Sequence, residues 1–114
     1  MPLLKIQTNQ SLEGAQQQQL LSDASQLVAN ELGKPENYVM VAIEPPMPMS
    51  FAGSTEPTAY LELKSIGLPE SKTRDLSSAL CALIAQTTNI NKDRIYIEFA
   101  DAPRAMWGWN GGTF

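Results

Sequence analysis

Histidine is absent from this chain of 114 residues, and cysteine occurs once, as Cys81. Zinc and copper sites in proteins are built mainly from these two residue types, so the sequence predicts no metal centre and no bound cofactor. A single cysteine also excludes a disulfide within the chain. Cys81 lies among leucines at helical spacing, which is typical of a small apolar residue of the core.

Basic residues are scarce as well, with 8 Lys plus Arg against 12 Asp plus Glu and a net charge of -4. No basic stripe is present to neutralise phosphates, so we expect no nucleic-acid partner. The chain also lacks an apolar run of about 20 residues and a leader-like N-terminus, which predicts a cytoplasmic protein without a membrane segment or signal peptide. With 43% hydrophobic residues, the composition is typical of one globular domain spanning residues 1–114.

Proline directly follows the initiator methionine. Methionine is generally removed when the next residue is small, and its removal would expose the secondary amine of Pro2 at the N-terminus. An α-amino group titrates at about 7.7–8.0, and burial or a neighbouring cation lowers its pKa toward the range that suits a general base. Pro2 is therefore a candidate catalytic base, provided that Met1 is removed, although many chains begin with Met-Pro without catalytic meaning.

An internal repeat organises the rest of the chain. At an offset of 56 residues, seven pairs of like residues superpose, among them Leu20 on Leu76 and Val41 on Ile97. In each copy the hydrophobic period runs from alternating to helical and back to alternating. These segments are Leu4–Ile6, Leu20–Glu31 and Val39–Ile43 in the first copy, and Leu61–Leu63, Leu76–Ala85 and Ile95–Phe99 in the second.

The repeat predicts an α/β fold of two tandem β-α-β units that form a four-stranded sheet. Gly33 and Pro35 provide a stop for the first helix, and the segment 44–57, with four prolines and one glycine, joins the copies. Right-handed crossovers would place both helices on one face of the sheet. The other face would be open and of mixed polarity, with Leu3, Lys5, Gln7, Met40, Ala42, Tyr60, Glu62, Lys64, Tyr96 and Glu98 on it.

A mixed face of this kind fits a subunit interface that lines a cleft or channel. The tail beyond Asp101 carries Trp107, Trp109 and Phe114 among glycines and is too aromatic for a solvated terminus. It would pack either at the same interface or back onto its own subunit.

The chain resembles a known family along its whole length. The motifs are Met1-Pro2-Leu3-Leu4, Gly33-Lys34-Pro35-Glu36-Asn37-Tyr38, Ser50 to Gly67, Asp93-Arg94-Ile95-Tyr96-Ile97, and Gly108-Trp109-Asn110 to Thr113-Phe114. Together they are similar to the family of macrophage migration inhibitory factor and D-dopachrome tautomerase. The resemblance implies a homotrimer with active sites at the subunit boundaries and an N-terminal proline base.

The implied reaction is keto-enol tautomerisation of an aromatic α-keto acid such as phenylpyruvate. By resemblance Pro2 is the base, Lys34 pairs with the substrate carboxylate, the amide of Ile66 adds a hydrogen bond, and Tyr96 enters from the neighbouring subunit. The ring would be enclosed by Leu3, Tyr38, Trp109 and Phe114. Without Pro2 beside them these residues have ordinary interpretations: a lysine after a helix end is usually solvated, and Ile66 or Trp109 would be core.

The sequence departs from the family pattern at several places. Thr58-Ala59-Tyr60-Leu61 stands where the animal factor has Cys-x-x-Cys, which excludes the thiol-disulfide chemistry attributed to that motif. Lys64 replaces a histidine at the edge of the site, Glu98 replaces an asparagine, and Trp107 replaces a smaller aliphatic residue. A carboxylate at Glu98 would raise the pKa of the Pro2 amine, and all three changes bear on substrate preference.

A different class of function stays open, namely a cytokine-like or receptor-binding protein with a vestigial pocket. The resemblance is also compatible with secretion without a leader peptide. The wider superfamily includes enzymes that use the proline for dehalogenation, hydration or decarboxylation. Those reactions usually need further arginines near the proline, and Arg74, Arg94 and Arg104 match no such motif. The residues present favour the tautomerase.

Overall fold

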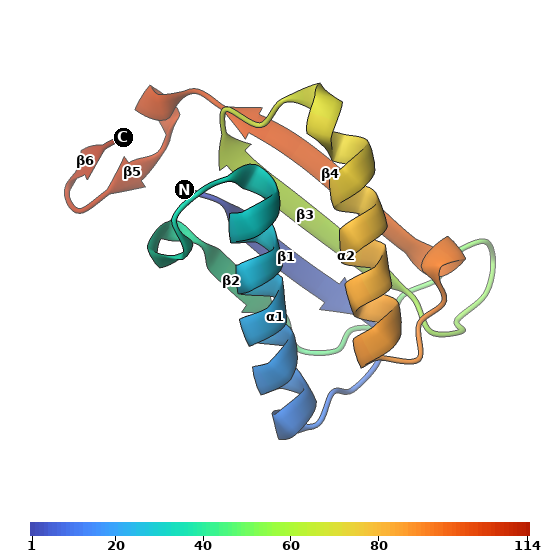
Figure 1. Cartoon of the computed structure of the whole chain (residues 1–114). Helices are drawn as coiled ribbons and strands as arrows, with labels where there is room; N and C mark the ends of the chain where they lie inside the picture. The colour runs from blue at the N-terminus through green and yellow to red at the C-terminus, as the bar shows by residue number, and fades with distance from the viewer.

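The computed structural model describes all 114 residues. Two copies of a strand-helix-strand unit follow one another along the chain and share a single sheet (Figure 1). The elements are β1 (Leu3–Thr8), α1 (Gly14–Leu32), β2 (Met40–Ile43), β3 (Ala59–Ile66), α2 (Thr73–Thr87), β4 (Ile95–Ala102), β5 (Gly108–Trp109) and β6 (Gly112–Thr113), with short 3₁₀ turns at 36–38, 70–72, 92–94 and 104–106.

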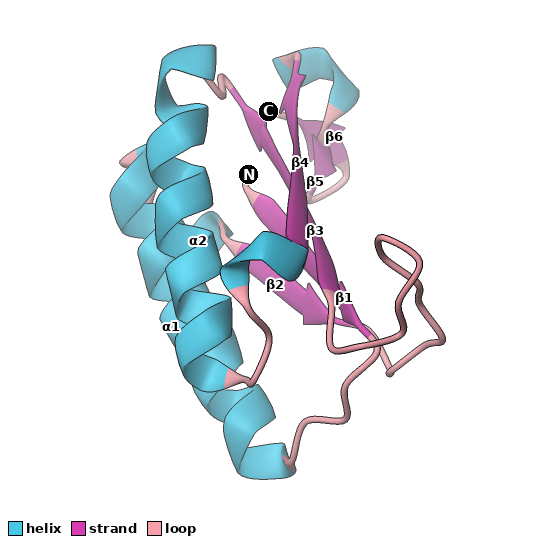
Figure 2. Cartoon of the chain, turned by 90° about the vertical axis from the view of Figure 1, so that its right-hand side faces the viewer, coloured by secondary structure: helices cyan, strands magenta, loops and turns pink.

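The four long strands lie in the order β2-β1-β3-β4. Within each unit the two strands are parallel, and the units meet through the antiparallel pair β1 and β3. Both helices cover the same face of the sheet, as the side view in Figure 2 shows. The prediction of a four-stranded sheet with two helices on one face is therefore confirmed.

The core lies between the helices and the sheet, because strand residues alternate between the two faces. Along β1, the buried residues Leu4, Ile6 and Thr8 alternate with half-buried ones. Leu4 and Ile6 belong to one apolar cluster, whose other members are Leu20, Ala24, Val28, Ala59, Leu61, Leu63, Leu68, Leu76, Leu80, Ile84, Ile90 and Ile95. The ten residues predicted for the open face are half-buried or exposed, and none belongs to this core.

The first helix ends where the sequence predicted. Gly33 adopts the left-handed conformation at φ 63°, and the amide of Lys34 donates a 3.0 Å hydrogen bond to the carbonyl of Ala29. Glu13 and Gln16 form a reciprocal capping box at the start of the same helix. The chain then turns through residues 36–38 into β2, which brings Tyr38 beside the N-terminus. Neither α1 nor α2 combines the length and the apolar composition that a membrane-spanning helix needs.

Candidate functional site

A cavity of about 400 Å³ lies at the end of the sheet where β1 begins. Its volume is in the range of small-molecule sites, and most of its lining is apolar or aromatic. The lining residues are Met1, Pro2, Leu3, Asn37, Tyr38, Val39, Met40, Trp107, Gly108, Trp109 and Phe114. Six residues predicted for the site therefore line one cavity: Pro2, Leu3, Tyr38, Trp107, Trp109 and Phe114.

Three aromatic rings form one wall of this cavity. Tyr38 makes edge-to-face contacts with Trp109 and Phe114, with ring centroids 5.5 and 5.7 Å apart, and the last two rings stack at 5.4 Å. These contacts fall in the favourable range for aromatic pairs. Trp109 is nevertheless 52% exposed, so one side of the wall faces out of the molecule.

A two-residue turn carries this wall. Asn110 and Gly111 have φ of 51° and 79° between the short strands β5 and β6, as in hairpins with Asn-Gly turns. The amide of Phe114 donates to the carbonyl of Trp107 at 3.2 Å, which closes the hairpin base. Of the two arrangements considered for the tail, these ring contacts place its aromatic residues on the chain's own Tyr38.

The N-terminal amine lies at the cavity beside Lys34. It donates a hydrogen bond to the carbonyl of Tyr38, and Pro2 behind it is fully buried. Partial burial, and next the nearby ammonium of Lys34, lower the pKa of the Met1 amine below its ordinary value, because both disfavour a second positive charge. Lys34 itself is half-buried and takes part in no ion pair with a carboxylate of the chain.

Other predicted site residues lie outside the cavity wall. Ile66 is 6% exposed at the end of β3, two residues beyond the Lys64 that pairs with Leu3, and hence at the same end of the sheet as Pro2. Lys64 is exposed on the open face, with its ammonium 3.7 Å from a carboxylate oxygen of Glu62.

Tyr96 and Glu98 lie farther away on β4. Tyr96 is in register with Tyr60 and, through it, with Gln7 near the opposite end of β1. Since a strand rises about 3.3 Å per residue, Tyr96 lies roughly 13 Å along the sheet from the level of Leu3. Its side of the sheet is open, and the residue is 64% exposed. Neither residue lines the cavity of its own chain.

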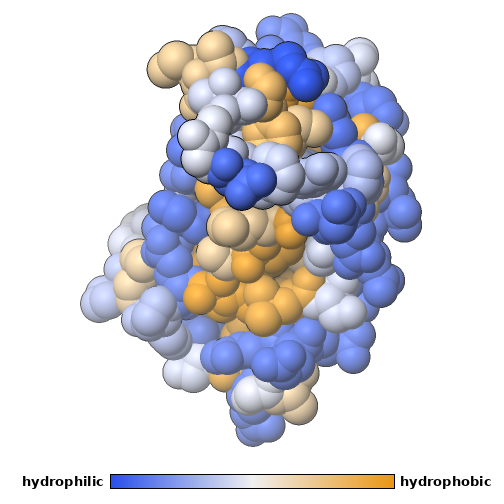
Figure 3. All heavy atoms as spheres, turned by 90° about the vertical axis from the view of Figure 1, so that its left-hand side faces the viewer, coloured by the Kyte–Doolittle hydropathy of each residue, from blue (hydrophilic) through white to orange (hydrophobic).

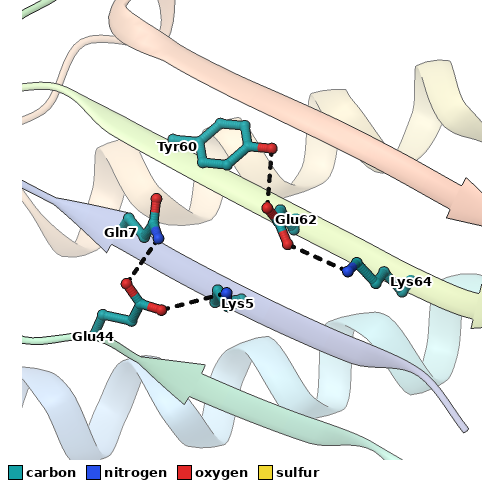
Figure 4. A network of polar contacts seen from close by, with 6 residues as sticks. All are labelled: Lys5, Gln7, Glu44, Tyr60, Glu62 and Lys64. Carbon is teal, nitrogen blue, oxygen red and sulfur yellow. Dashed lines mark hydrogen bonds and ion pairs between the residues drawn. The ribbon is translucent and has the colours of Figure 1, made fainter.

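Polar side chains on the open face form two small networks, drawn in Figure 4. In one, Glu44 accepts a 2.7 Å hydrogen bond from Gln7 and lies 3.5 Å from the ammonium of Lys5. In the other, the hydroxyl of Tyr60 donates to Glu62 at 3.2 Å. Burial on this face, followed by the carboxylates of Glu62 and Glu98, raises the pKa of Tyr60. Glu98 thus affects the pKa of Tyr60 within the chain, and an effect of Glu98 on the Pro2 amine of a neighbouring subunit stays a prediction.

Sequence reasoning missed Asn37, Val39, Met40 and Gly108 among the lining residues. Asn37 and Val39 adjoin Tyr38 in the sequence, Met40 lies two residues beyond it, and Gly108 lies between two predicted tryptophans, so their neighbours were a signal for them. Met1 was treated only as a residue to be removed, whereas it forms part of the wall.

A tandem β-α-β sheet with an apolar cavity at the N-terminus, where a cation adjoins the terminal amine, defines a protein of the tautomerase superfamily. The chain belongs to the macrophage migration inhibitory factor (MIF) family, because the sequence model of that family matches residues 1–114.

Individual relatives support the same family. The chain is 39% identical to macrophage migration inhibitory factor of Meriones unguiculatus over 115 residues, which cover 100% of this chain and 99% of the relative. A homologue from Prochlorococcus marinus is 46% identical with a TM-score of 0.93, and 98% of each chain is covered. The factor from Toxoplasma gondii is 34% identical with a TM-score of 0.94, covering 98% of this chain and 99% of that one.

Proposed function

We propose that this chain is a keto-enol tautomerase for aromatic α-keto acids such as phenylpyruvate, with the secondary amine of Pro2 as general base once Met1 is removed. The observation that carries the proposal is the position of Pro2, which is fully buried at the wall of an apolar, aromatic cavity. The Met1 amine already has a lowered pKa there. A free amine at Pro2 would lie beside the same apolar wall and the same Lys34, so its pKa should be lowered for the same reasons.

Each part of the substrate has a counterpart at this end of the molecule. The amine takes a proton from the carbon beside the keto group, and the resulting ammonium returns a proton at the other end of the enolate. Lys34 does not line the cavity, but its positive charge reaches the terminal amine there and has no carboxylate partner in the chain, so it would attract the substrate carboxylate. Tyr38, Trp109 and Phe114 enclose the aromatic ring, and the amide of Ile66 adds a hydrogen bond.

The proposed active unit is a homotrimer in which Tyr96 serves the cavity of a neighbouring subunit. Strands β2 and β4 each pair on one side only, so each leaves a free edge whose unpaired backbone groups can bond to another chain. Figure 3, which views the molecule from the left-hand side of Figure 1, shows apolar residues gathered at the middle of this side with polar residues around them. Met40, on the edge strand β2, is 64% exposed, so its apolar side chain is accessible to a partner subunit.

The experiment that tests the base is Pro2→Gly, assayed for phenylpyruvate enolisation on protein whose N-terminal mass shows that Met1 is absent. Glycine keeps an N-terminal amine but lacks the proline ring that fixes the orientation of that amine. We expect kcat/KM to fall about 10²–10⁴-fold, the usual worth of a positioned general base. Pro46→Gly, an exposed loop position, is the matched control and should retain full activity.

Protein that retains Met1 should be nearly as inactive as Pro2→Gly, because the nitrogen of Pro2 is then an amide and Met1 stands in the wall of the cavity. A loss of less than threefold for Pro2→Gly on trimmed protein would remove Pro2 from the role of base.

A further inference from the structure

Arg94 lies just before β4 and bonds to backbone carbonyls of the segment that joins the two β-α-β units. Its Nε donates to the carbonyl of Pro57 at 2.9 Å, and its Nη1 to that of Phe51 at 3.2 Å. Its Nη2 donates to the carbonyls of Ser54 and Glu56, both at 3.1 Å. No carboxylate forms an ion pair with this half-buried guanidinium. Four bonds from one planar group fix the path of the segment.

The tightest part of that segment is a turn that also contains backbone strain. Phe51 and Ser54 exchange two backbone hydrogen bonds, at 2.9 and 3.0 Å, around Ala52 and Gly53. Ala52 has φ of 54°, a left-handed conformation that residues other than glycine adopt at a cost. Strained backbone persists only where its surroundings hold it in place. Arg94 supplies that hold, since it binds the same two carbonyls that close the turn.

The turn presents the ring of Phe51 to Tyr96. The two ring centroids are 4.7 Å apart at an interplanar angle of 67°, an edge-to-face contact. The guanidinium carbon of Arg94 lies 5.2 Å from the centroid of Phe51, within range of a cation–π interaction. Tyr96 is 64% exposed, and a side chain so exposed would otherwise be free to change rotamer.

We propose that Arg94 is a positioning residue, which holds the turn 51–54 so that Phe51 orients Tyr96 for the cavity of a neighbouring subunit. This inference rests on the proposed function, because it needs Tyr96 to act in tautomerisation. Arg94 makes no contact with substrate in this arrangement. Its effect on the reaction passes through two rings and should disappear when the hydroxyl of Tyr96 is removed.

The test uses Arg94→Lys and Phe51→Leu, each alone and combined with Tyr96→Phe, in the full chain with Met1 removed. Lysine keeps the charge but cannot bind four carbonyls, and leucine removes the ring while leaving Arg94 intact. Arg74→Lys is the matched control, because Arg74 is exposed and makes no hydrogen bond. We expect each variant to lower kcat/KM for phenylpyruvate by up to about 10²-fold, because a misplacement of about 1 Å can cost that much, and Arg74→Lys to change nothing.

In the Tyr96→Phe background the same two substitutions should lower kcat/KM little further, because the effects of coupled residues are not additive. An equal loss in both backgrounds would overturn the proposal and leave Arg94 a structural residue only. A Tyr96→Phe variant with full activity would overturn it too, without touching the assignment of Pro2.

A readout independent of activity separates this inference from the proposed function. The ring protons of Tyr96, observed by NMR, should be shifted by the edge of Phe51 in the wild type and should move toward averaged values in Arg94→Lys. An unchanged Tyr96 signal in Arg94→Lys overturns the positioning role. If trimmed wild-type protein does not enolise phenylpyruvate, the proposed function fails, whereas the NMR comparison still decides whether Arg94 orients Tyr96.

Discussion

Lys34 is the one residue of the site whose charge has two separate effects. After burial, its ammonium is the second cause that lowers the pKa of the terminal amine, and under the proposed function it is also the cation that would pair with the substrate carboxylate. A lysine just after the C-cap of α1 would be ordinary on a solvated helix, because the helix dipole favours a positive charge at the C-terminus. Here the lysine lies close enough to the N-terminal amine for its charge to lower the pKa of that amine.

Lys34→Ala is therefore expected to change two measured quantities. KM for phenylpyruvate should rise about 10- to 150-fold, because a hydrogen bond to a charged group contributes about 1.5–3 kcal/mol. The acid limb of the kcat/KM profile should move to higher pH, since loss of a neighbouring cation raises the pKa of the amine and a base must be deprotonated to act. Lys92→Ala, at an exposed position, is the control. An unchanged KM would return Lys34 to the role of a solvated lysine.

At the scale of elements, the termination of α1 decides how the site is built. Gly33 stops the helix in a left-handed conformation, so that Lys34 leaves the helix axis and residues 36–38 can carry Tyr38 to the N-terminus. The Asn-Gly turn between β5 and β6 acts in the same way on the other side of the cavity, where it returns Phe114 to Trp109. Two turns of positive φ thus bring three aromatic rings together.

Gly33→Ala should lower the free energy of unfolding by about 1–2 kcal/mol, the cost of a left-handed conformation for an L-residue. A Cβ at this position would meet no atom within 4 Å, so the loss would come from the backbone alone. Gly14→Ala, at the first residue of α1 with equal space and no positive φ, is the matched control and should be neutral or stabilising. Urea denaturation at one protein concentration measures both. Equal effects of the two substitutions would contradict this account.

At the scale of the whole molecule, one chain holds the two halves of the proposed site at opposite ends of its sheet. Pro2 lies where β1 begins, and Tyr96 lies near the other end of β1 across two strands. The sheet is continuous between them, so no movement of a side chain can join them within one chain. Association of copies is the arrangement that would bring a Tyr96 to a Pro2.

Mixing two impaired variants tests this arrangement. Tyr96→Phe and Lys34→Ala, each impaired alone, should recover part of the activity when their subunits are dissociated, mixed and reassembled, because some boundaries then combine an intact Lys34 with an intact Tyr96. Mixing without dissociation is the control and should give the average of the two activities. A monomer by light scattering, or no gain after reassembly, would show that the site does not cross subunits.

Much of the fold could be predicted from the sequence, because its signals are local. Alternation around Leu4 and Ile6, helical spacing from Leu20, and the stop at Gly33 each depend on a few neighbouring residues, and the repeat then pairs the two units. Several site residues could be proposed for the same reason, as the motifs around Pro2 and Tyr38 are contiguous. Every one of these patterns can be recognised without knowing what lies across the sheet.

Other features were decided only by the tertiary structure. The packing of Trp109 and Phe114 on Tyr38, and the contacts of Arg94 with the turn that carries Phe51, join residues more than 35 positions apart. The sequence alone determined the order of strands and helices and the chemical types present, because these follow from local periodicity and turn residues. Tertiary structure decided which side chains meet in the cavity. A contact between two rings depends on how elements far apart in the sequence pack together, and no local pattern encodes that packing.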